Sequence, residues 1–563
     1  MSDRLKLRKT IAGAALSAAL LFGLNTGGFA EDRAALMAAH RGGELRLLAK
    51  AAAGSIDPQI NYTLQNWQIF QMTYDGLLAF KKAQGEEGFI VVPNLAEAIP
   101  APENGGKTYT FKLRSGIKFS NGKDVTVEDV VASFQRIFKV VGPTSGSFYN
   151  GIVGADACIK TPDTCTLEGG ISADKAKNTV TINLVAPDAE FFYKISVPHA
   201  SIVPADAPPK DSGTAVIPGT GSYMIESNDP NKQMVLVRNP HFKEWSVDAQ
   251  PDGFVDKVIY DYGLTEEAQI NAIANGQADW TVDPPPADRL AEIGAKYADQ
   301  VALNPLTAIW YAPMNVNIAP FNNVKARQAL NFAIDRKAIA GLFGGKNLAT
   351  PTCQVLPVKF PGHESFCQYT ANPGEKWSAP DLDMAKKLVE ESGTKGQAIA
   401  IITEDADVSR NIGIYLQSVL KELGYDATVK PISSNIQFTY IQNTNNKVQI
   451  SISQWYQDYP AASNFLNVLL GCGSFREGSD SSINMAGFCD KDLQAQMDAA
   501  KALGVTDQTA ANKQWAAIDK AVMEKAPWVP LFNPKKFDLR SKRVGNFTFS
   551  SQFYWVMALA WVK

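Results

Sequence analysis

Residues 398–431 read AIAIITEDADVSRNIGIYLQSVLKELGYDATVKP, and this stretch decides the fold class. Its pattern predicts a strand over 398–402, a helix over 409–423 and a second strand over 426–431. Strands that are separated by a helix pair in parallel, because the chain needs a crossover to return to the same end of the sheet. The sequence therefore predicts an α/β fold in the second half of the chain.

The part of the chain that precedes this stretch is also predicted to contain both strands and helices. Thr126 is expected to begin a helix, because its hydroxyl can accept a hydrogen bond from the backbone N–H of Asp129 in a capping box. Proline and glycine are spread evenly, and neither a short repeat nor a low-complexity segment is visible. Further strands are predicted at 44–48, 109–113 and 179–185, and further helices at 67–72, 266–276 and 323–343.

Residues 1–30 have the pattern of a secretory signal peptide. Basic residues between Arg4 and Lys9 precede an apolar run over 11–24, and small residues follow up to Ala30. We therefore expect a mature chain that begins near Glu31 and resides in the periplasm. A transmembrane anchor is the alternative, although the apolar run is shorter than the roughly 20 residues that a span needs. No cysteine follows the run directly, so no lipid-modified N-terminus is expected.

Size and charge narrow the classes of function. A chain of 563 residues is longer than one ordinary domain and suggests two or three lobes. Apolar residues make up 45% and charged residues 20%, as in soluble globular proteins with a sizeable core. The formal net charge is -3, and no basic cluster is interleaved with aromatic residues. These features argue against nucleic acid as a partner.

The six cysteines fall into three local pairs, which agrees with an oxidising compartment. Six cysteines allow fifteen connectivities, so the pairing of neighbours rests on spacing alone, and free buried thiols are the alternative. Because no C-x-x-C motif occurs and the four histidines are scattered, we expect neither a metal site nor a cofactor. The candidate disulfide residues are Cys158 with Cys165, Cys353 with Cys367, and Cys472 with Cys489.

Motifs of catalysis are missing from the sequence. It has no G-x-S-x-G elbow, no Walker-type loop, no H-E-x-x-H and no dinucleotide fingerprint. Acidic pairs such as Asp405 and Asp407 lie in polar stretches that are typical of a solvated surface. We therefore expect a binding protein and not an enzyme, with a secreted hydrolase as a remote alternative.

Four segments, in order, resemble the family 5 extracellular solute-binding proteins, the oligopeptide and dipeptide binders of ABC importers. The first segment, 108–130, contains a strand, the stretch RSGIKFSNG and the helix start at Thr126. The fourth, 454–460, reads QWYQDYP and is followed by Asn464 and Asn467. The other two are residues 219–223 with 237–240, and residues 324–337. Together the four segments span most of residues 43–535.

The resemblance implies a type II periplasmic-binding-protein-like α/β fold. Two lobes would be joined by crossing strands, with an extra subdomain and a ligand cleft between lobes that closes around the ligand. The protein would act as a monomer and dock on the ABC permease and ATPase subunits of the inner membrane. The expected division is 1–30 signal peptide, 31–80 first part of lobe I, 81–214 extra subdomain, 215–304 second part of lobe I, 305–534 lobe II, and 535–563 C-terminal part of lobe I.

The fourth segment carries the ligand prediction. In the peptide-binding members its aspartate lies in the cleft and pairs with the α-ammonium of the peptide, and the matching residue here is Asp458. An incoming ammonium offsets the desolvation cost of a buried carboxylate. The neighbouring backbone, at Gln454, Trp455 and Tyr456, is implied to pair with the ligand as an added strand. A structural role for Asp458, capping the turn before Pro460, is the alternative.

Two further places match ligand-contacting positions of the family by their order alone. They are residues 62–67, ending at Trp67, and the aromatic pair Phe148 and Tyr149; an ordinary core role is an equal alternative for both. Arg410 or Arg476 could meet a ligand carboxylate, and the sequence does not choose between them.

The function predicted from the resemblance is the capture of peptides, or of similar small solutes, for import. Many family members have glycine where this chain has Gln454. For that reason an opine, an oligosaccharide or a metal chelate, bound by the same fold, remains the alternative ligand.

Overall fold

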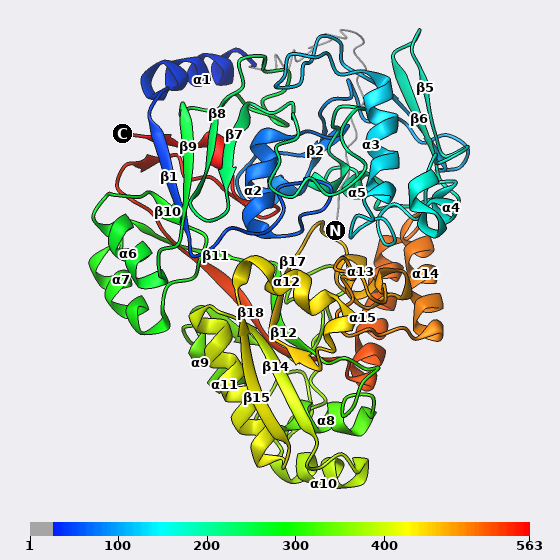
Figure 1. Cartoon of the computed structure of the whole chain (residues 1–563), viewed down its shortest axis with the longest axis vertical. Coiled ribbons are helices and arrows are strands. Elements are labelled where there is room, and N and C mark those ends of the chain that lie inside the picture. Colours follow the sequence, from blue (N-terminus) through cyan, green and yellow to red (C-terminus); the bar gives the residue numbers. More distant parts are fainter. Residues whose placement is uncertain (1–25) are drawn as a thin grey trace, which may run out of the picture.

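The computed structural model describes residues 26–563 and has two lobes with a subdomain beside the upper one (Figure 1). Residues 1–25 of the predicted signal peptide lie outside the described residues, and residues 26–30 begin helix α1 (Thr26–His40). Within the described part, no helix combines the length and the apolar composition that crossing a membrane requires.

Lobe I is built on a five-stranded mixed sheet. Its strands, in spatial order, are β10 (Trp280–Thr281), β1 (Glu44–Ala49), β9 (Lys257–Tyr262), β8 (Gln233–Arg238) and β7 (Tyr223–Asp229). Strand β1 pairs in parallel with β9 and β10, and β8 is antiparallel to both of its neighbours. Its core includes Leu45 and Leu47 of β1 packed with Ile69 and Met72. The helices of this lobe are α2 (Leu64–Thr73), α6 (Glu266–Ala274) and α7 (Leu290–Lys296).

The subdomain packs an antiparallel sheet against one amphipathic helix. The strands are β4 (Thr108–Lys112), β6 (Thr179–Asn183) and β5 (Ile171–Asp174), in that order, and the helix is α3 (Val127–Lys139). The predicted capping box is confirmed: the Thr126 hydroxyl accepts from the Asp129 N–H, and the Asp129 carboxylate accepts from the Thr126 N–H. Smaller elements are β2 (Leu78–Phe80), β3 (Val91–Pro93), α4 (Ala155–Lys160) and α5 (Phe191–Lys194).

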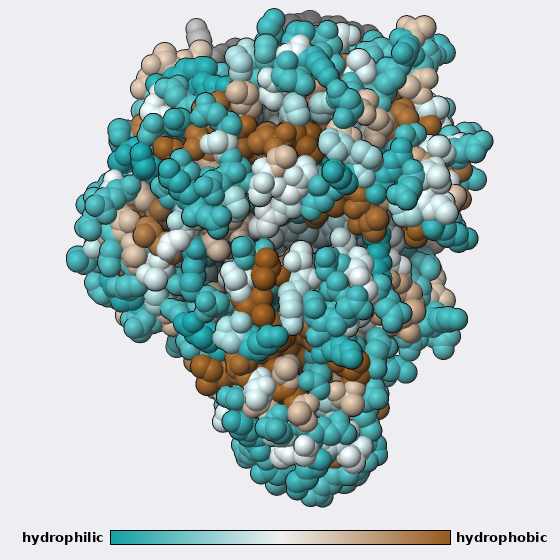
Figure 2. All heavy atoms as spheres, viewed as in Figure 1, coloured by the Kyte–Doolittle hydropathy of each residue, from teal (hydrophilic) through white to brown (hydrophobic). Residues whose placement is uncertain are grey.

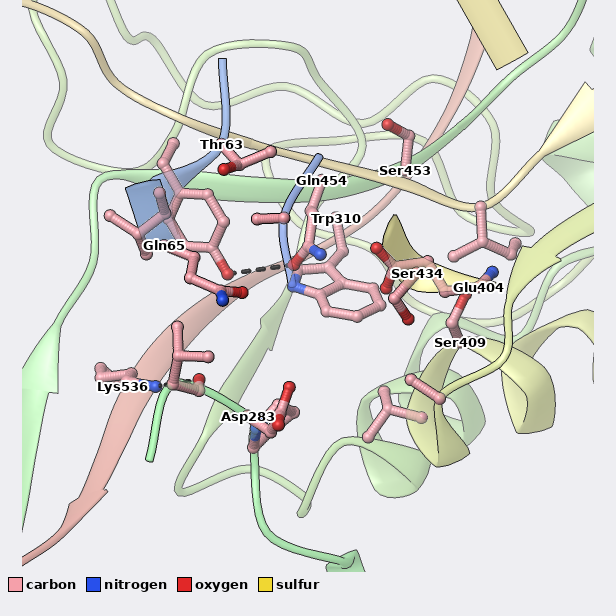
Figure 3. A pocket seen from close by; sticks show the side chains of 18 of the residues that line it. Thr63, Gln65, Asp283, Trp310, Glu404, Ser409, Ser434, Ser453, Gln454 and Lys536 are labelled. Atoms are coloured by element: carbon pink, nitrogen blue, oxygen red, sulfur yellow. Dashed lines mark hydrogen bonds between the residues drawn. The ribbon is translucent and has the colours of Figure 1, made fainter. Parts of the chain in front are cut away.

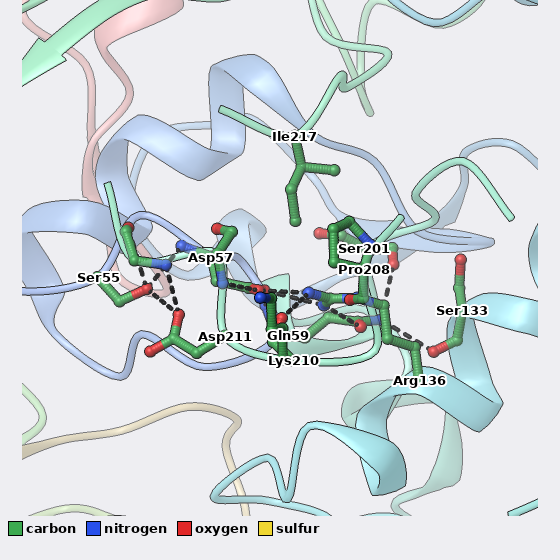
Figure 4. A network of polar contacts seen from close by, with 12 residues as sticks. Ser55, Asp57, Gln59, Ser133, Arg136, Ser201, Pro208, Lys210, Asp211 and Ile217 are labelled. Atoms are coloured by element: carbon green, nitrogen blue, oxygen red, sulfur yellow. Dashed lines mark hydrogen bonds and ion pairs between the residues drawn. The ribbon is translucent and has the colours of Figure 1, made fainter. Parts of the chain in front are cut away.

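A buried ion pair ties α3 to the loop that follows β1 (Figure 4). The Arg136 guanidinium donates to both carboxylate oxygens of Asp57, at 3.0 and 2.5 Å, and to the Gln59 side-chain oxygen at 2.8 Å. It also donates to the backbone carbonyls of Pro208 and Lys210 at 2.7 and 2.9 Å. The guanidinium thus satisfies its donors while holding three separate chain segments together.

Lobe II contains two sheets. The first has the order β11 (Val301–Pro305), β18 (Trp528–Leu539), β12 (Ala308–Pro313) and β17 (Ser453–Tyr456), with β13 (Ala349–Pro351) also paired to β18. The second is β15 (Asp426–Ile432), β14 (Ala398–Glu404) and β16 (Ile450–Ser451), all parallel. Helix α11 (Asp407–Glu422) connects β14 to β15. The strand, helix and parallel strand predicted from residues 398–431 are therefore confirmed.

The prediction of one continuous helix over 323–343 is wrong. The structure has two helices there, α8 (Val324–Ala333) and α9 (Arg336–Leu342), with Asp335 in an extended conformation between them. The Asp335 carboxylate accepts from the backbone N–H groups of Lys337 and Ala338 at 2.9 and 3.0 Å, so it caps the start of the second helix. The remaining helices of lobe II are α10 (Leu382–Ser392), α12 (Ser434–Gln442), α13 (Ser463–Leu470), α14 (Lys491–Gly504) and α15 (Gln508–Lys525).

One long strand passes from lobe II to lobe I. Strand β18 pairs with β12 through Trp528–Phe532 and with β11 through Lys535–Leu539, and Arg540 then bridges to Trp280 of lobe I. The Trp280 indole N–H also donates to Asp538 of β18 at 2.9 Å. The chain ends on lobe I through β19 (Val544–Gly545), β20 (Phe549–Ser550), β21 (Tyr554–Trp555) and β22 (Trp561–Val562).

The six cysteines are joined as sequence neighbours. Their sequence separations are 7, 14 and 17 residues, so each bridge closes a short loop. The first bridge lies in the subdomain and the other two in lobe II. The bridges are Cys158–Cys165, Cys353–Cys367 and Cys472–Cys489.

Candidate ligand-binding site

Two adjoining cavities lie where the lobes meet. The larger has a volume of about 220 Å³ and is lined by both lobes; the smaller, of about 60 Å³, lies beside it. In the space-filling view, a stripe of hydrophobic residues borders the hollow between the upper and lower halves, whereas most of this face is hydrophilic (Figure 2). The residues that line both cavities are Tyr62, Thr63, Leu64, Phe438, Gln454 and Tyr456.

Asp458 lines the smaller cavity, two residues after the end of β17. It is only 3% exposed. One carboxylate oxygen, Oδ2, accepts from the Tyr62 hydroxyl and from the Asn464 side-chain amide, both at 2.6 Å. Within residues 26–563, no protein donor reaches the other oxygen. Burial raises the pKa of Asp458 to about 7, although the two hydrogen bonds oppose this shift.

The backbone N–H of Asp458 donates to the Asn464 side-chain oxygen at 2.8 Å. Asn464 lies at the start of α13 and therefore holds the aspartate by both its backbone and its side chain. In the described range 26–563, no backbone N–H of the turn before Pro460 donates to the carboxylate. Its two bonds, the local one from Asn464 and the distant one from Tyr62, both use Oδ2 and leave Oδ1 for another donor.

Gln454, Trp455 and Tyr456 lie on β17, which is the edge strand of its sheet. The Tyr456 hydroxyl donates to the Gln454 side-chain oxygen at 3.0 Å, and both residues line both cavities. Trp455 lines the smaller one and packs edge-on against Tyr62, with ring centroids 5.0 Å apart. Of the strands that the structure describes, β12 is the only one that pairs with β17, so the other edge of β17 has no strand partner among them.

Several polar atoms on residues of the smaller cavity have no partner. The Trp455 indole nitrogen, the Gln457 side-chain oxygen and the Tyr554 hydroxyl are buried and make no hydrogen bond within the described part of the chain. Unpaired buried polar atoms are rare in finished protein cores. Three of them belong to residues that line the same cavity as Asp458.

The two aromatic candidates from earlier in the chain are placed differently. Trp67 lines the smaller cavity, stacks on Tyr62 at 5.3 Å between centroids, and donates its indole N–H to the Asn61 carbonyl at 2.9 Å. Tyr149 lines neither cavity: it is fully buried, and its hydroxyl donates to the Lys194 carbonyl at 2.9 Å. The site therefore includes Trp67, and Tyr149 lies in the core behind it.

Neither arginine candidate lines a cavity. Arg410 forms ion pairs with Asp405, at 2.8 Å, and with Asp407. Arg476 donates to the backbone carbonyls of Val141 and Gly142, at 3.3 and 3.2 Å, and so joins lobe II to the subdomain. Both guanidinium groups are already engaged by the protein.

Sequence reasoning missed the contribution of the C-terminal tail. Tyr554 and Gln552 line the smaller cavity, and the Gln552 side-chain amide donates to the Asp458 carbonyl. They lie more than 90 residues from Asp458 along the chain, and no local pattern links them to it. Asn464 follows the fourth of the segments that resemble the family, but no contact with Asp458 was predicted for it.

The larger cavity carries charged residues from both lobes (Figure 3). Asp283 follows β10, and its Oδ2 accepts from the Lys50 backbone N–H at 2.6 Å and from the Gln269 amide at 2.8 Å. Glu404 ends β14, and burial together with the nearby Asp283 raises its pKa to about 7. The Lys536 ammonium donates to the Val282 carbonyl at 2.7 Å. Among the described residues, no cluster of three or more His, Cys, Asp and Glu side chains could hold a metal ion.

Comparisons with known proteins agree with this architecture. The family model described as bacterial extracellular solute-binding proteins, family 5 Middle, matches residues 91–477. The periplasmic oligopeptide-binding protein OppA of Salmonella typhimurium is 26% identical over 457 residues, which cover 78% of this chain and 79% of the relative. The probable deoxycholate-binding periplasmic protein YgiS of Escherichia coli is 25% identical and covers 88% of each chain.

A solved structure has the same fold. The periplasmic binding protein DppA of Helicobacter pylori, in complex with the peptide STSA, matches with a TM-score of 0.79 and 19% identity. The match covers 94% of this chain and 99% of DppA. The predicted two-lobed α/β fold is therefore confirmed.

Proposed function

The chain belongs to the bacterial extracellular solute-binding proteins of family 5, and on that premise we propose that it captures peptides with a free N-terminus for an ABC importer. Relatives whose names describe periplasmic oligopeptide binding support the proposal. The protein would bind its ligand without chemical turnover, because its function is to hold the solute and release it.

One observation carries the ligand assignment: Asp458 offers a buried carboxylate with one unused oxygen at the junction of the lobes. A charged α-ammonium would give that oxygen its missing donor. At a separation of about 4 Å and an effective dielectric constant near 20, the pair contributes about 4 kcal/mol before desolvation. The ligand would thus offset the desolvation free energy of the buried Asp458 carboxylate in the empty site.

The edge strand β17 supports the peptide class in particular. An extended peptide could add to its free backbone edge, and main-chain hydrogen bonds of this kind do not depend on the side chains of the ligand. Recognition would then come from the ammonium at Asp458 and from the backbone, while the larger cavity would receive side chains.

The setting of the protein is part of the same proposal. The signal-peptide pattern of residues 1–30 and the periplasmic relatives support a periplasmic location. There the protein would act as a monomer whose closed, ligand-bound form docks on the permease of the inner membrane, with the ATPase on the opposite side. Closure follows only if the ligand contacts both lobes, because a ligand shifts an equilibrium by its differential affinity for the two states.

A second candidate function is capture of a non-peptide solute by the same fold. The side chain of Gln454 stands where many family members have glycine, and much of the wall of the larger cavity is apolar. A relative with the name of a probable deoxycholate-binding protein supports this candidate.

Calorimetric titration with Ala-Ala-Ala and its N-acetylated form tests the proposal. We expect the free peptide to bind at least 100-fold more tightly than the acetylated one, since acetylation removes the charge that Asp458 would meet. Asp458→Asn should weaken the free peptide by a similar factor. The matched control, Asp426→Asn, changes an exposed aspartate on β15 and should leave affinity unchanged.

Two results would count against the peptide assignment. Equal affinity for the free and acetylated peptides would remove the role of Asp458, and mass spectrometry that finds only non-peptide molecules released from the purified protein would favour the second candidate.

A further inference from the structure

The larger cavity has a charge pattern that the proposed function leaves unexplained (Figure 3). Glu404 of lobe II and Asp283 of lobe I both line it. We infer that this cavity selects a side chain with an apolar stem and a positive charge at its end, that is, a lysine or arginine of the bound peptide. The inference rests on the proposed function, because the side chain belongs to the peptide that is held at Asp458.

The Glu404 carboxylate lacks a partner of its own. Neither a hydrogen bond nor an ion pair reaches it from any residue in the range 26–563. The Lys50 ammonium, whose charge favours the ionised form of Glu404, is engaged by the Glu266 carboxylate at 3.5 Å and the Asp405 carbonyl at 2.5 Å. A cation brought by the ligand would therefore be the first direct partner of Glu404.

Asp283 faces the same space from the other lobe. Its two hydrogen bonds from the protein both end on Oδ2, and within the described chain no donor reaches Oδ1. Lys536, the nearby ammonium, is directed to the Val282 carbonyl. The charged residues that line the cavity are the carboxylates of Asp283 and Glu404 and the ammonium groups of Lys536 and the exposed Lys535.

The remaining wall is suited to an alkyl stem. Trp310 is 4% exposed and lies in Figure 3 between Gln454 and Glu404, and its indole nitrogen makes no hydrogen bond with any described residue. The apolar side chains of this wall include Phe343, Leu290, Leu348, Val408 and Ile452. An alkyl chain would bury apolar surface here before its charge reaches the two carboxylates.

The two lobes contribute one carboxylate each, which has a consequence for closure. A cation between Glu404 and Asp283 would be attracted to both lobes at once. It would also relieve the repulsion between these two carboxylates. A basic side chain would therefore favour the closed form more than an alkyl side chain of equal length.

Calorimetric titration with a tripeptide panel tests the inference. The parent is Ala-Ala-Ala with a free N-terminus, and each residue in turn is replaced by lysine, norleucine or glutamate. We expect, at one position, lysine to bind at least tenfold more tightly than norleucine, and glutamate to bind most weakly. Glu404→Gln should reduce the preference for lysine over norleucine to less than threefold while leaving the norleucine peptide within threefold of its wild-type affinity.

The control variant is Glu390→Gln, which changes an exposed glutamate on α10 and should keep the full preference for lysine. The inference is overturned if lysine never exceeds norleucine at any position, or if the preference survives in Glu404→Gln. A free diamine such as 1,5-diaminopentane binding as tightly as the lysine peptide would overturn the assignment to a peptide side chain. If no peptide in the panel binds, the proposed function itself fails.

Discussion

The carboxylate of Asp458, which is proposed to bind the ligand, lowers the stability of the ligand-free protein. Its pKa in the folded protein is raised from 3.8 to about 7 by burial. Because the carboxyl is protonated more readily in the folded state than in the unfolded one, it does not affect the free energy of unfolding below pH 4. Between pH 4 and 7 it lowers the free energy of unfolding increasingly, and above pH 7 the full destabilisation is present. The energetic ceiling is about 4 kcal/mol, since each pKa unit corresponds to 1.36 kcal/mol.

We therefore expect Asp458→Asn to stabilise the ligand-free protein. The amide oxygen of asparagine can still accept from Tyr62 and Asn464, but it carries no charge to desolvate. Urea unfolding at pH 8 should show an increase of about 1–4 kcal/mol in the free energy of unfolding, and the difference should vanish near pH 4. A variant that is less stable than the parent at pH 8 would contradict this account.

The same carboxyl should make peptide affinity depend on pH. Below pH 7 the empty site is protonated, so binding of an ammonium must first release that proton. We expect affinity for Ala-Ala-Ala to fall about tenfold per unit between pH 7 and pH 5. The hydroxyls of Tyr62 and Tyr554 beside it have pKa values raised well above 10, mainly by burial, and do not titrate in this range.

Calorimetry at pH 5, 6 and 7 gives the profile. In Asp458→Asn the weak residual affinity should show no such slope, because the titrating carboxyl is gone. A slope that persists in the variant would assign the pH dependence to a different group.

At the scale of elements, the attachment of helix α3 to its neighbours depends on the charged side chain of Arg136. Arg136 makes five hydrogen bonds that connect α3, the loop after β1 and the segment around Pro208 (Figure 4). Arg136→Met would leave Asp57 buried and unpaired. We expect a loss of about 3–5 kcal/mol in the free energy of unfolding.

Urea denaturation of Arg136→Met and of the double variant Arg136→Met with Asp57→Leu measures this effect. The double variant should recover much of the loss, because it removes both charges together. A single variant within 1 kcal/mol of the parent would show that the network does not hold the subdomain.

The elements also show where prediction from sequence succeeds and where it stops. The strand and helix pattern of residues 398–431 was sufficient, because buried aliphatic side chains recur at the period of each element. Prediction from the sequence pattern failed at Asp335, within the helix predicted over 323–343. Good helix formers lie on both sides of Asp335, and only the geometry of the cap reveals the break. Asp458 was predicted through family resemblance, and its ligand role stays a prediction. Tyr554 and Gln552 could not be predicted, since tertiary folding alone brings the tail to β17.

At the scale of the whole molecule, contacts between lobes outside the cavities should set how long a ligand stays. The Lys50 ammonium of lobe I donates to the Asp405 carbonyl of lobe II at 2.5 Å, and Glu266 accepts from the Asp407 N–H at 3.4 Å. Lys50→Met removes the first contact without changing a residue that lines a cavity. We expect the dissociation rate of a bound peptide to rise about fivefold, the equivalent of one hydrogen bond of about 1 kcal/mol.

Stopped-flow fluorescence, with the tryptophans of the site as reporters, measures that rate. The control is Lys81→Met, which removes an ion pair with Glu87. Equal dissociation rates for Lys50→Met and the parent would show that the bond between the lobes does not limit release.

If the chain is exported as proposed, its three disulfides have a consequence for how it matures. Each joins a cysteine to the next one along the chain, within 17 residues or fewer, and none links one lobe to the other. A thiol emerging from the secretion channel would meet its correct mate before any later cysteine arrives. Oxidation can then proceed in step with translocation, with no scrambled bridges to repair, and the hinge between the halves stays unconstrained by covalent cross-links.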